Sequence, residues 1–236
     1  KLAEADRRSL TALINKGIVV IHEEEAAAAL EKEVLAEAPK LTREQEQVLE
    51  EIKGRLLPPQ YEVFLLHGVT GSGKTEIYFQ CLAQTLQAGY QGIVLFPEIS
   101  LTTHLVERFY ARFGRQVAVL HSGLPLQERL ATIDRISKGQ VSIVVGTRSA
   151  VFAPVPKLGL IILDEEHETS YQQEVSPKYH AREVAIVRAY LNKIPVILGS
   201  ATPSLESYHQ VHRGKFKLLT MEERVEQRHL PEILVT

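Results

Sequence analysis

The residues best suited to chemistry form a glycine-rich segment, Gly68–Thr75, which reads G-x-x-x-x-G-K-T. Its glycines permit backbone dihedrals and close approaches that a Cβ would block. Successive backbone N–H groups of such a loop can point at phosphate oxygens, with the N-terminus of a helix behind them. Lys74 would then reach the β and γ phosphates, and Thr75 would place its hydroxyl on Mg²⁺. The alternative is a glycine-rich turn with a solvated lysine. The segment predicts a nucleoside-triphosphate site made by Gly68, Thr70, Gly71, Ser72, Gly73, Lys74 and Thr75.

A second group of reactive side chains follows the apolar run Leu160–Leu163, which ends in Asp164, Glu165, Glu166 and His167. Asp164 would hold Mg²⁺, directly or through water, and Glu165 would orient and deprotonate the attacking water. Acids at the end of an apolar strand can also be a polar terminus that faces solvent, but the upstream phosphate-binding loop favours the catalytic interpretation. His167 is either a coupling residue near the γ-phosphate or a surface histidine.

Small hydroxyl residues follow another apolar run, Val196–Leu198, in the segment Gly199–Pro203. Ser200 and Thr202 suit a γ-phosphate sensor that hydrogen-bonds toward the acidic cluster. The same residues would also make an ordinary turn. Their order and spacing after the acidic motif favour the sensor.

The elements that must position these groups alternate between short apolar runs and longer helical patterns from Thr42 onward. Such alternation indicates an α/β fold, in which a mostly parallel sheet is covered by helices on both faces. Ligands of such sheets bind at the carboxyl ends of strands, where all of these motifs fall. The expected strands are Val63–His67, Gly92–Phe96, Val117–His121, Val141–Gly146, Leu160–Asp164 and Val196–Ser200. The expected helices are Glu76–Gln87, Leu101–Phe113, Leu126–Ser137, Ala181–Leu191 and Ser204–His212.

The first 40 residues have a different pattern. Ala5–Asn15 looks helical, and Ile18–Ile21 reads as a short strand. Glu23–Ala38 is rich in Glu and Ala and is followed by Pro39. We expect residues 1–22 to end a preceding small domain and residues 23–40 to form a helical connector.

Composition excludes several classes of protein. The 27 basic and 29 acidic residues give a net charge of −2, so no overall basic field indicates nucleic acid, although a local groove can still be basic. The single cysteine, Cys81, excludes an internal disulfide and a cysteine-based zinc cluster, and it fits a reducing cytosol. No apolar stretch approaches 18 residues and no signal peptide is visible, so we expect a cytoplasmic protein without membrane contact. The first residue is Lys, which indicates a piece of a longer protein.

The order of the motifs, a phosphate-binding loop, then D-E-x-H at Asp164 and S-A-T at Ser200, resembles the first motor lobe of superfamily 2 helicases. The flanking motifs are similar to those of bacterial primosomal replication-restart helicases, a family of 3′→5′ DNA translocases; these motifs are Leu95–Thr102, Leu120–Ser122, Gly146–Phe152 and Tyr179–Glu183. The resemblance covers roughly residues 41–236. It implies a RecA-like lobe that binds ATP and Mg²⁺ over residues 41–220. It also implies the end of a winged-helix domain in residues 1–22 and the start of a linker to a second lobe in residues 221–236.

The resemblance gives roles to further residues. Gln45 is placed like a residue that contacts adenine, although Thr42 with Gln45 three residues later also forms a helix capping box unaided. Arg148 suits a DNA phosphate contact, and an internal salt bridge is its competing interpretation. The residues that would grip the backbone of a DNA strand are Pro97, Glu98, Thr147, Arg148 and Ser149.

The segment Thr169–Arg182 resembles an aromatic-rich loop that senses single-stranded DNA and relays this to ATP hydrolysis. Bases stack on such rings with little sequence preference, for about 1–3 kcal/mol per base. Tyr171 can equally pack against its own loop, and His180 and Arg182 can be simple anchors. The DNA-contacting residues implied here are Tyr171, Tyr179, His180 and Arg182.

The resemblance also implies partners and further parts. The partners would be single-stranded and forked DNA, primosome components and single-strand-binding protein, at replication forks of the nucleoid. A second lobe with an arginine finger, a zinc-binding element and an amino-terminal DNA-binding domain are expected in the parent protein but not in this chain. We therefore expect this chain alone to bind ATP·Mg²⁺ weakly, to hydrolyse it slowly and to unwind nothing. The alternatives are another superfamily 2 translocase or RNA helicase, or a non-hydrolysing nucleotide-switch module, against which Glu165 argues.

Overall fold

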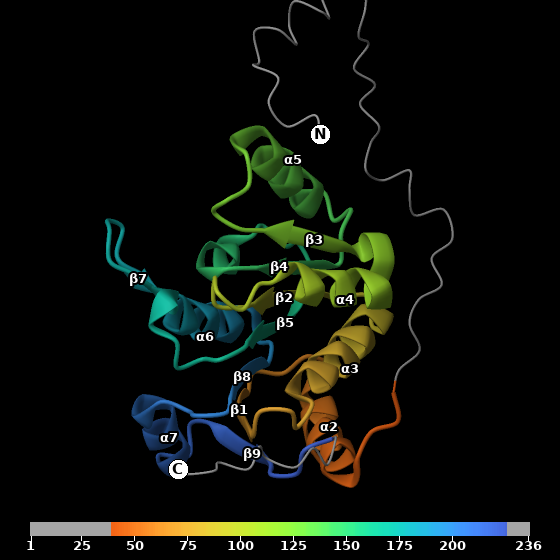
Figure 1. The fold of residues 1–236 in the computed structure, drawn as a ribbon, viewed down its shortest axis with the longest axis vertical. Coiled ribbons are helices and arrows are strands. Elements are labelled where there is room, and N and C mark those ends of the chain that lie inside the picture. The colour runs from red at the N-terminus through yellow and green to blue at the C-terminus, as the bar shows by residue number, and fades with distance from the viewer. Residues whose placement is uncertain (1–38, 226–236) are drawn as a thin grey trace, which may run out of the picture. The chain divides into compact units, whose positions relative to one another are not determined.

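Seven strands form one sheet, in which every pair of neighbouring strands is parallel. The computed structural model describes residues 39–225. Within these residues the strand order is β3-β4-β2-β5-β8-β1-β9 (Figure 1). The strands are β1 Val63–Gly68, β2 Gln91–Leu95, β3 Val117–Leu120, β4 Ile143–Gly146, β5 Leu158–Leu163, β8 Val196–Ser200 and β9 Lys217–Met221. A separate antiparallel hairpin pairs β6 Gln172–Gln173 with β7 Tyr179–His180.

Four of the described helices, α2, α4, α6 and α7, begin at a side chain that accepts a hydrogen bond from a backbone amide of the first turn. The hydroxyl of Thr42 accepts from the Gln45 amide at the start of α2, where both bonds of a capping box are present. Ser204 caps α7 in the same way, since its hydroxyl accepts from the Ser207 amide. The helices are α2 Arg43–Leu56, α3 Lys74–Gln87, α4 Thr103–Phe113, α5 Leu126–Ser137, α6 Ala181–Asn192 and α7 Leu205–His212, with 3₁₀ turns η1 Gly114–Gln116, η2 Arg148–Phe152 and η3 Thr169–Tyr171.

Side chains on the two faces of the sheet pack into two separate hydrophobic cores. In β1, Phe64 and Leu66 pack with α2, α3 and α4, whereas Val63 and Leu65 face the core that contains residues of α5 and α6. The helices thus cover the sheet on both sides (Figure 1). Because the central strands are buried on both faces, they read as nearly continuous apolar runs rather than as alternating ones.

The predicted α/β fold with a parallel sheet is confirmed, and each expected strand and helix is present, with small shifts at the ends. The helix α3 begins at Lys74 because Gly73, with φ 87°, already turns the chain into it. The helix α4 begins at Thr103, since the extended Thr102 is its cap. The edge strand β9 was not predicted. Only Leu219 and Met221 of this strand are buried, so its pattern is weak.

Predictions that concern residues 1–38 or 226–236 lie outside the described residues. These are the end of a small domain at 1–22, the connector up to residue 38, and the linker beyond Val225.

Candidate active site

The phosphate-binding loop joins β1 to α3, and its glycines determine its shape. Gly71 and Gly73 have φ values of 85° and 87°, which side-chain-bearing residues rarely adopt. A Cβ on Gly73 would lie 2.3 Å from Nε2 of Gln45, and a Cβ on Gly68 would lie 2.6 Å from Oγ of Ser72. The loop therefore stays a bare backbone cradle at the N-terminus of α3, where free N–H groups and the helix dipole favour an anion.

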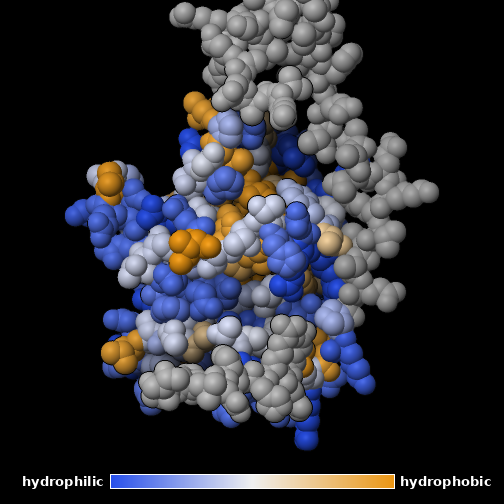
Figure 2. Space-filling view, in the orientation of Figure 1, coloured by the Kyte–Doolittle hydropathy of each residue, from blue (hydrophilic) through white to orange (hydrophobic). Residues whose placement is uncertain are grey.

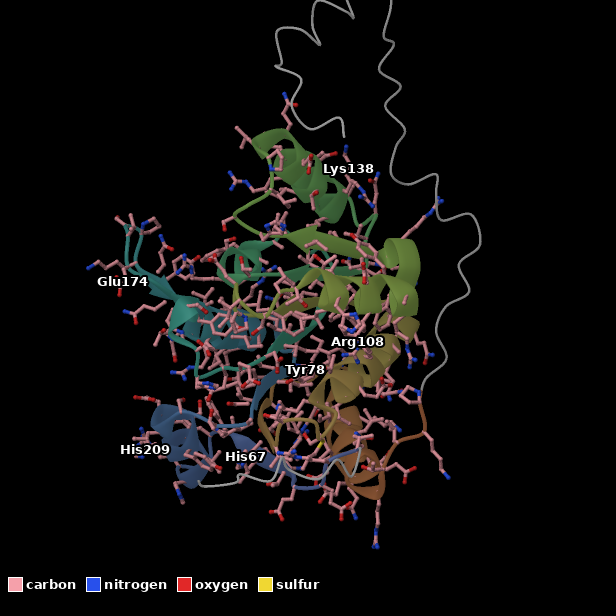
Figure 3. The ribbon with its side chains drawn as sticks, viewed as in Figure 1. His67, Tyr78, Arg108, Lys138, Glu174 and His209 are labelled. Atoms are coloured by element: carbon pink, nitrogen blue, oxygen red, sulfur yellow. The ribbon has the colours of Figure 1, made fainter. Side chains whose placement is uncertain are left out.

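Lys74 and the acids of β5 face the same cleft. Nζ of Lys74 donates to the carbonyl of Gly68 (2.8 Å) and lies 4.0 Å from Oε1 of Glu165. The cleft has a volume of about 730 Å³, and both Thr75 and Asp164 line it. The prediction that these motifs meet at one site is thus confirmed. Three further basic residues line the cleft, namely Lys40, Arg224 and Arg108 of α4, the last of which is labelled in Figure 3.

Asp164 is the first residue after β5, and a hydrogen bond fixes its side chain. The buried hydroxyl of Tyr78 donates to Oδ1 of Asp164 (2.8 Å). Tyr78 reaches it from α3, between that helix and the sheet (Figure 3). A Cβ on Gly199 would lie 1.7 Å from the Tyr78 hydroxyl, so only glycine fits beside this pair. Burial raises the pKa of Asp164 to about 6, although the hydrogen bond from Tyr78 lowers it.

Glu165 has a left-handed backbone, with φ 44°. This conformation is uncommon for a residue with a Cβ and costs on the order of 1–3 kcal/mol unless the surroundings impose it. Oε2 of Glu165 lies 3.5 Å from the Ala201 amide and 3.7 Å from Nδ1 of His167. The side chain thus lies between Lys74 and the end of β8.

The predicted contact between the small hydroxyl residues and the acidic motif is confirmed. Nδ1 of His167 lies 2.8 Å from Oγ of Ser200, and Nε2 lies 3.4 Å from Oγ1 of Thr202. These contacts join the end of β5 to the end of β8. The roles of all three residues in coupling stay predictions.

Gln45 braces the phosphate-binding loop. Its Oε1 accepts from the Thr42 amide (3.0 Å), and its Nε2 donates to the carbonyl of Ser72 (2.9 Å). The predicted capping box is confirmed, and the same side chain also lines the cleft. Its contact with adenine stays a prediction.

The last residue of β9 and the segment after it also contact this loop. The Val69 amide donates to the carbonyl of Met221 (3.2 Å), and the Val225 amide donates to that of Gly71 (3.0 Å). A Cβ on Gly73 would meet the Val225 side chain at 3.1 Å. The chain therefore leaves the last described strand along the phosphate-binding loop.

The structure corrects the DNA-stacking role of Tyr171. Its side chain is 0% exposed, and its hydroxyl bonds to the carbonyl oxygens of Asp164 (2.7 Å) and Leu95 (3.0 Å). The ring is thus part of the core beneath the acidic motif, and its hydroxyl lies within hydrogen-bond distance of two carbonyls at the ends of neighbouring strands. A base cannot stack on it in this conformation.

Two arginines that the sequence assigned to DNA are engaged inside the protein. Arg148 donates to the carbonyls of Ser170 and Gln172 and so anchors the hairpin, rather than forming the internal salt bridge considered as its alternative. Arg182 is largely buried and pairs with Glu166 (2.8 Å), which supports the anchor interpretation over DNA contact.

The other predicted DNA residues differ in accessibility. Pro97 and Thr147 are buried, whereas Glu98 and Ser149 are exposed, and Tyr179 and His180 are partly exposed. The hairpin of β6 and β7 projects from the body (Figure 1), and at its tip one small apolar spot lies among hydrophilic side chains (Figure 2). In this turn, Val175 is 71% exposed. Contacts of these residues with DNA stay predictions.

Sequence reasoning missed Tyr78 and gave Glu166 no role. Tyr78 lies four residues after Lys74, on the same face of α3, and this spacing was a usable signal. Glu166 pairs with side chains distant in sequence, and its only local signal was its place in the acidic motif.

Comparison with known proteins identifies the family. The sequence matches the DEAD/DEAH box helicase family over residues 42–211, which is most of the chain. The chain belongs to this family. Membership implies that the chain binds ATP, and the cleft around Lys74 is the candidate site for it. In the described part of the chain, no helix is long and apolar enough to cross a membrane.

Several relatives carry the name replication restart protein PriA. The protein from Bacillus subtilis is 54% identical over 193 residues, which are 82% of this chain and 24% of the relative. The protein from Synechocystis is 46% identical over 243 residues, which cover 100% of this chain and 29% of the relative. The chain thus spans about a quarter of the length of these relatives.

Solved structures show the same fold. RecG bound to a three-way DNA junction aligns with a TM-score of 0.60 at 23% identity, over 80% of this chain and 24% of that one. The helicase MrfA bound to DNA and AMPPNP aligns with a TM-score of 0.53 at 17% identity, over 93% of this chain and 29% of that one. At these identities the likeness concerns the fold alone.

The residues present fit a magnesium nucleotide. The loop is a glycine cradle, and the buried Oγ of Ser72 has no hydrogen-bond partner within residues 39–225. Lys74 supplies a positive charge, and Thr75 and Asp164 supply oxygen ligands of the kind that Mg²⁺ prefers. The donor set and the shape of the cleft therefore agree with the family.

Proposed function

We propose that this chain is the first motor lobe of a replication-restart DNA helicase, which couples ATP hydrolysis to 3′→5′ translocation along single-stranded DNA. The observation that carries the proposal is the meeting of Lys74, Thr75, Asp164 and Glu165 in one cleft, with Lys74 4.0 Å from Glu165. The similarity to PriA proteins supports the choice of DNA and of replication restart.

The four residues have separate roles in this proposal. Lys74 and the loop amides bind the phosphates, and Thr75 and Asp164 hold Mg²⁺, which neutralises charge on the phosphates when bound. Glu165 accepts the proton of the attacking water. His167, Ser200 and Thr202 link this site to the end of β8 and sense the γ-phosphate.

The proposal extends to partners by similarity. Single-stranded and forked DNA would contact the accessible residues Glu98, Ser149, Tyr179 and His180. In the parent protein we propose a second lobe with an arginine finger, a zinc-binding element, contacts with primosome components and single-strand-binding protein, and a cytoplasmic place at replication forks. This lobe alone would hydrolyse ATP slowly and would not unwind DNA.

Replacement of the acid tests the proposal. In the full-length protein, Glu165→Gln should retain ATP binding and abolish turnover, because the amide cannot accept the proton. Lys74→Ala should instead weaken ATP binding itself, measured by titration with a fluorescent nucleotide. Turnover at the wild-type rate in Glu165→Gln would refute the assignment and favour a site that uses another base.

The nucleic acid is tested separately. Single-stranded DNA should stimulate ATP hydrolysis by the full-length protein more strongly than RNA of the same sequence. Equal or greater stimulation by RNA would favour the alternative of an RNA helicase. No hydrolysis under any condition would favour a nucleotide-switch module.

A further inference from the structure

Glu166 is a buried acid for which the proposed function has no use. Its side chain is 0% exposed, and four groups donate to it: the Ser204 amide (2.7 Å), the Ser204 hydroxyl (3.1 Å), the Ser207 hydroxyl (2.8 Å) and Nη1 of Arg182 (2.8 Å). Burial alone would raise the pKa of Glu166, but the hydrogen bonds from Ser204, Arg182 and Ser207 bring it below its usual value. The carboxylate thus accepts four hydrogen bonds, one of them from a guanidinium.

The donors come from the beginnings of two helices. Arg182 lies in the first turn of α6, and Ser204 and Ser207 lie at the cap and in the first turn of α7. Free amides and the helix dipole make such termini favourable for a negative charge. One carboxylate thus ties the acidic motif to both helices.

Glu165, the residue before Glu166, has the strained left-handed backbone described above. Glu165 has φ 44°, and the Glu166 amide donates to the carbonyl of Gly199 (3.0 Å). Glu166 is thus held through both its backbone and its side chain. Glu165 cannot relax to an ordinary conformation without breaking these bonds, and a strained conformation persists only where its surroundings over-determine it.

We infer that Glu166, clamped by Arg182, Ser204 and Ser207, is a positioning residue that holds Glu165 in its left-handed conformation and so aims its carboxylate into the cleft beside Lys74. The inference rests on the proposed role of Glu165 as the base. It assigns Arg182 to this clamp instead of to DNA.

The chain offers a matched control on the same helix. Arg188 of α6 is also partly buried, but its guanidinium donates to the carbonyls of Val151 and Ala153 and does not contact Glu166. The substitutions Arg182→Ala and Arg188→Ala each remove one guanidinium from α6. They differ in their effect on the clamp.

The test measures ATP hydrolysis by the full-length protein at saturating single-stranded DNA. We expect Arg182→Ala to lower kcat by about 10- to 100-fold, as for a small misplacement of a catalytic group, while the KM for ATP stays within about twofold. Arg188→Ala should keep kcat within about twofold of the wild type. Arg182→Lys should recover part of the loss, because it restores the charge but not the planar geometry. Ser207→Ala removes one hydrogen bond to Glu166 and should lower kcat by a few-fold. This variant replaces Arg182→Ala in the test if Arg182→Ala does not fold.

Three results would overturn the inference. One is an equal kcat in the two alanine variants, and another is a parallel change of kcat and KM. The third is an effect of Arg182→Ala only on the DNA concentration for half-maximal stimulation, which would return Arg182 to DNA binding. Failure of the proposed function is distinguishable, since only then would Glu165→Gln also retain turnover.

Discussion

The contact of Gly199 with Tyr78 and Asp164 makes a quantitative prediction. In Gly199→Ala the added Cβ would lie 1.7 Å from the Tyr78 hydroxyl, 2.9 Å from Cζ of its ring and 3.3 Å from Oδ1 of Asp164. The tyrosine must therefore move, and its hydrogen bond to Asp164 must break. We expect a less stable protein with slower ATP hydrolysis, because Asp164 loses the bond that fixes its side chain.

The loss of stability follows from two contributions. A hydrogen bond to a charged group contributes about 1.5–3 kcal/mol, and overpacking of a dense core costs about 1–3 kcal/mol. The free energy of unfolding should thus fall by about 2.5–6 kcal/mol. For a chain of this size each kcal/mol lowers the Tm by about 2–4 °C, so the Tm should fall by about 5–24 °C.

A double-mutant cycle measured by calorimetry on the 236-residue chain tests this reasoning. Tyr78→Phe removes the hydroxyl that clashes, so Gly199→Ala should cost less in the Tyr78→Phe background, with a coupling of about 1–3 kcal/mol. The relief should be partial because the ring carbon is also close. Additive effects of the two changes, or a Gly199→Ala protein as stable as the wild type, would refute the packing described for this pair.

Further predictions concern the loop and the hairpin. Gly73→Ala should weaken ATP binding at least tenfold by titration, because a side chain at φ 87° is strained and would meet Gln45; wild-type affinity would contradict the fixed shape of the loop. Gln45→Ala should lower the free energy of unfolding by about 1–2 kcal/mol, as expected for a broken capping box, and should lower the Tm accordingly. An unchanged Tm would contradict the role of Gln45 in holding the loop. Tyr171→Phe should lower the free energy of unfolding by about 1–3 kcal/mol and leave the half-saturating concentration of DNA unchanged. Tyr179→Ala should instead raise that concentration about 5- to 100-fold, because a stacked base would lose its ring. A DNA-binding defect in Tyr171→Phe would restore its predicted role.

The sequence was sufficient for the phosphate-binding loop and the acidic motif because each is contiguous and follows a buried strand. It also placed them at the same edge, since parallel strands share the direction of their carboxyl ends. It did not reveal that β5, β8 and β1 are neighbours, which is what brings His167 to Ser200. Strand order depends on long-range pairing and has no local signature.

The errors arose where a side chain has two plausible environments. Tyr171 has an aromatic ring on which a base could stack. The ring points into the core instead, because its hydroxyl bonds to carbonyls of two strands that only the assembled sheet brings together. Arg182 lies 16 residues from Glu166, with the hairpin between them, so nothing local indicates their pairing. The edge strand β9 buries only one of its faces and lacks the apolar run that identified the central strands.

The bonds from Val69 to Met221 and from Val225 to Gly71 have a mechanical consequence. They attach the chain at Met221 and Val225 to the phosphate-binding loop at Val69 and Gly71. A change in the path of residues 221–225 would therefore have to break these two bonds or move the loop backbone with it. The shape of the loop thus depends on residues about 150 positions downstream as well as on its own glycines.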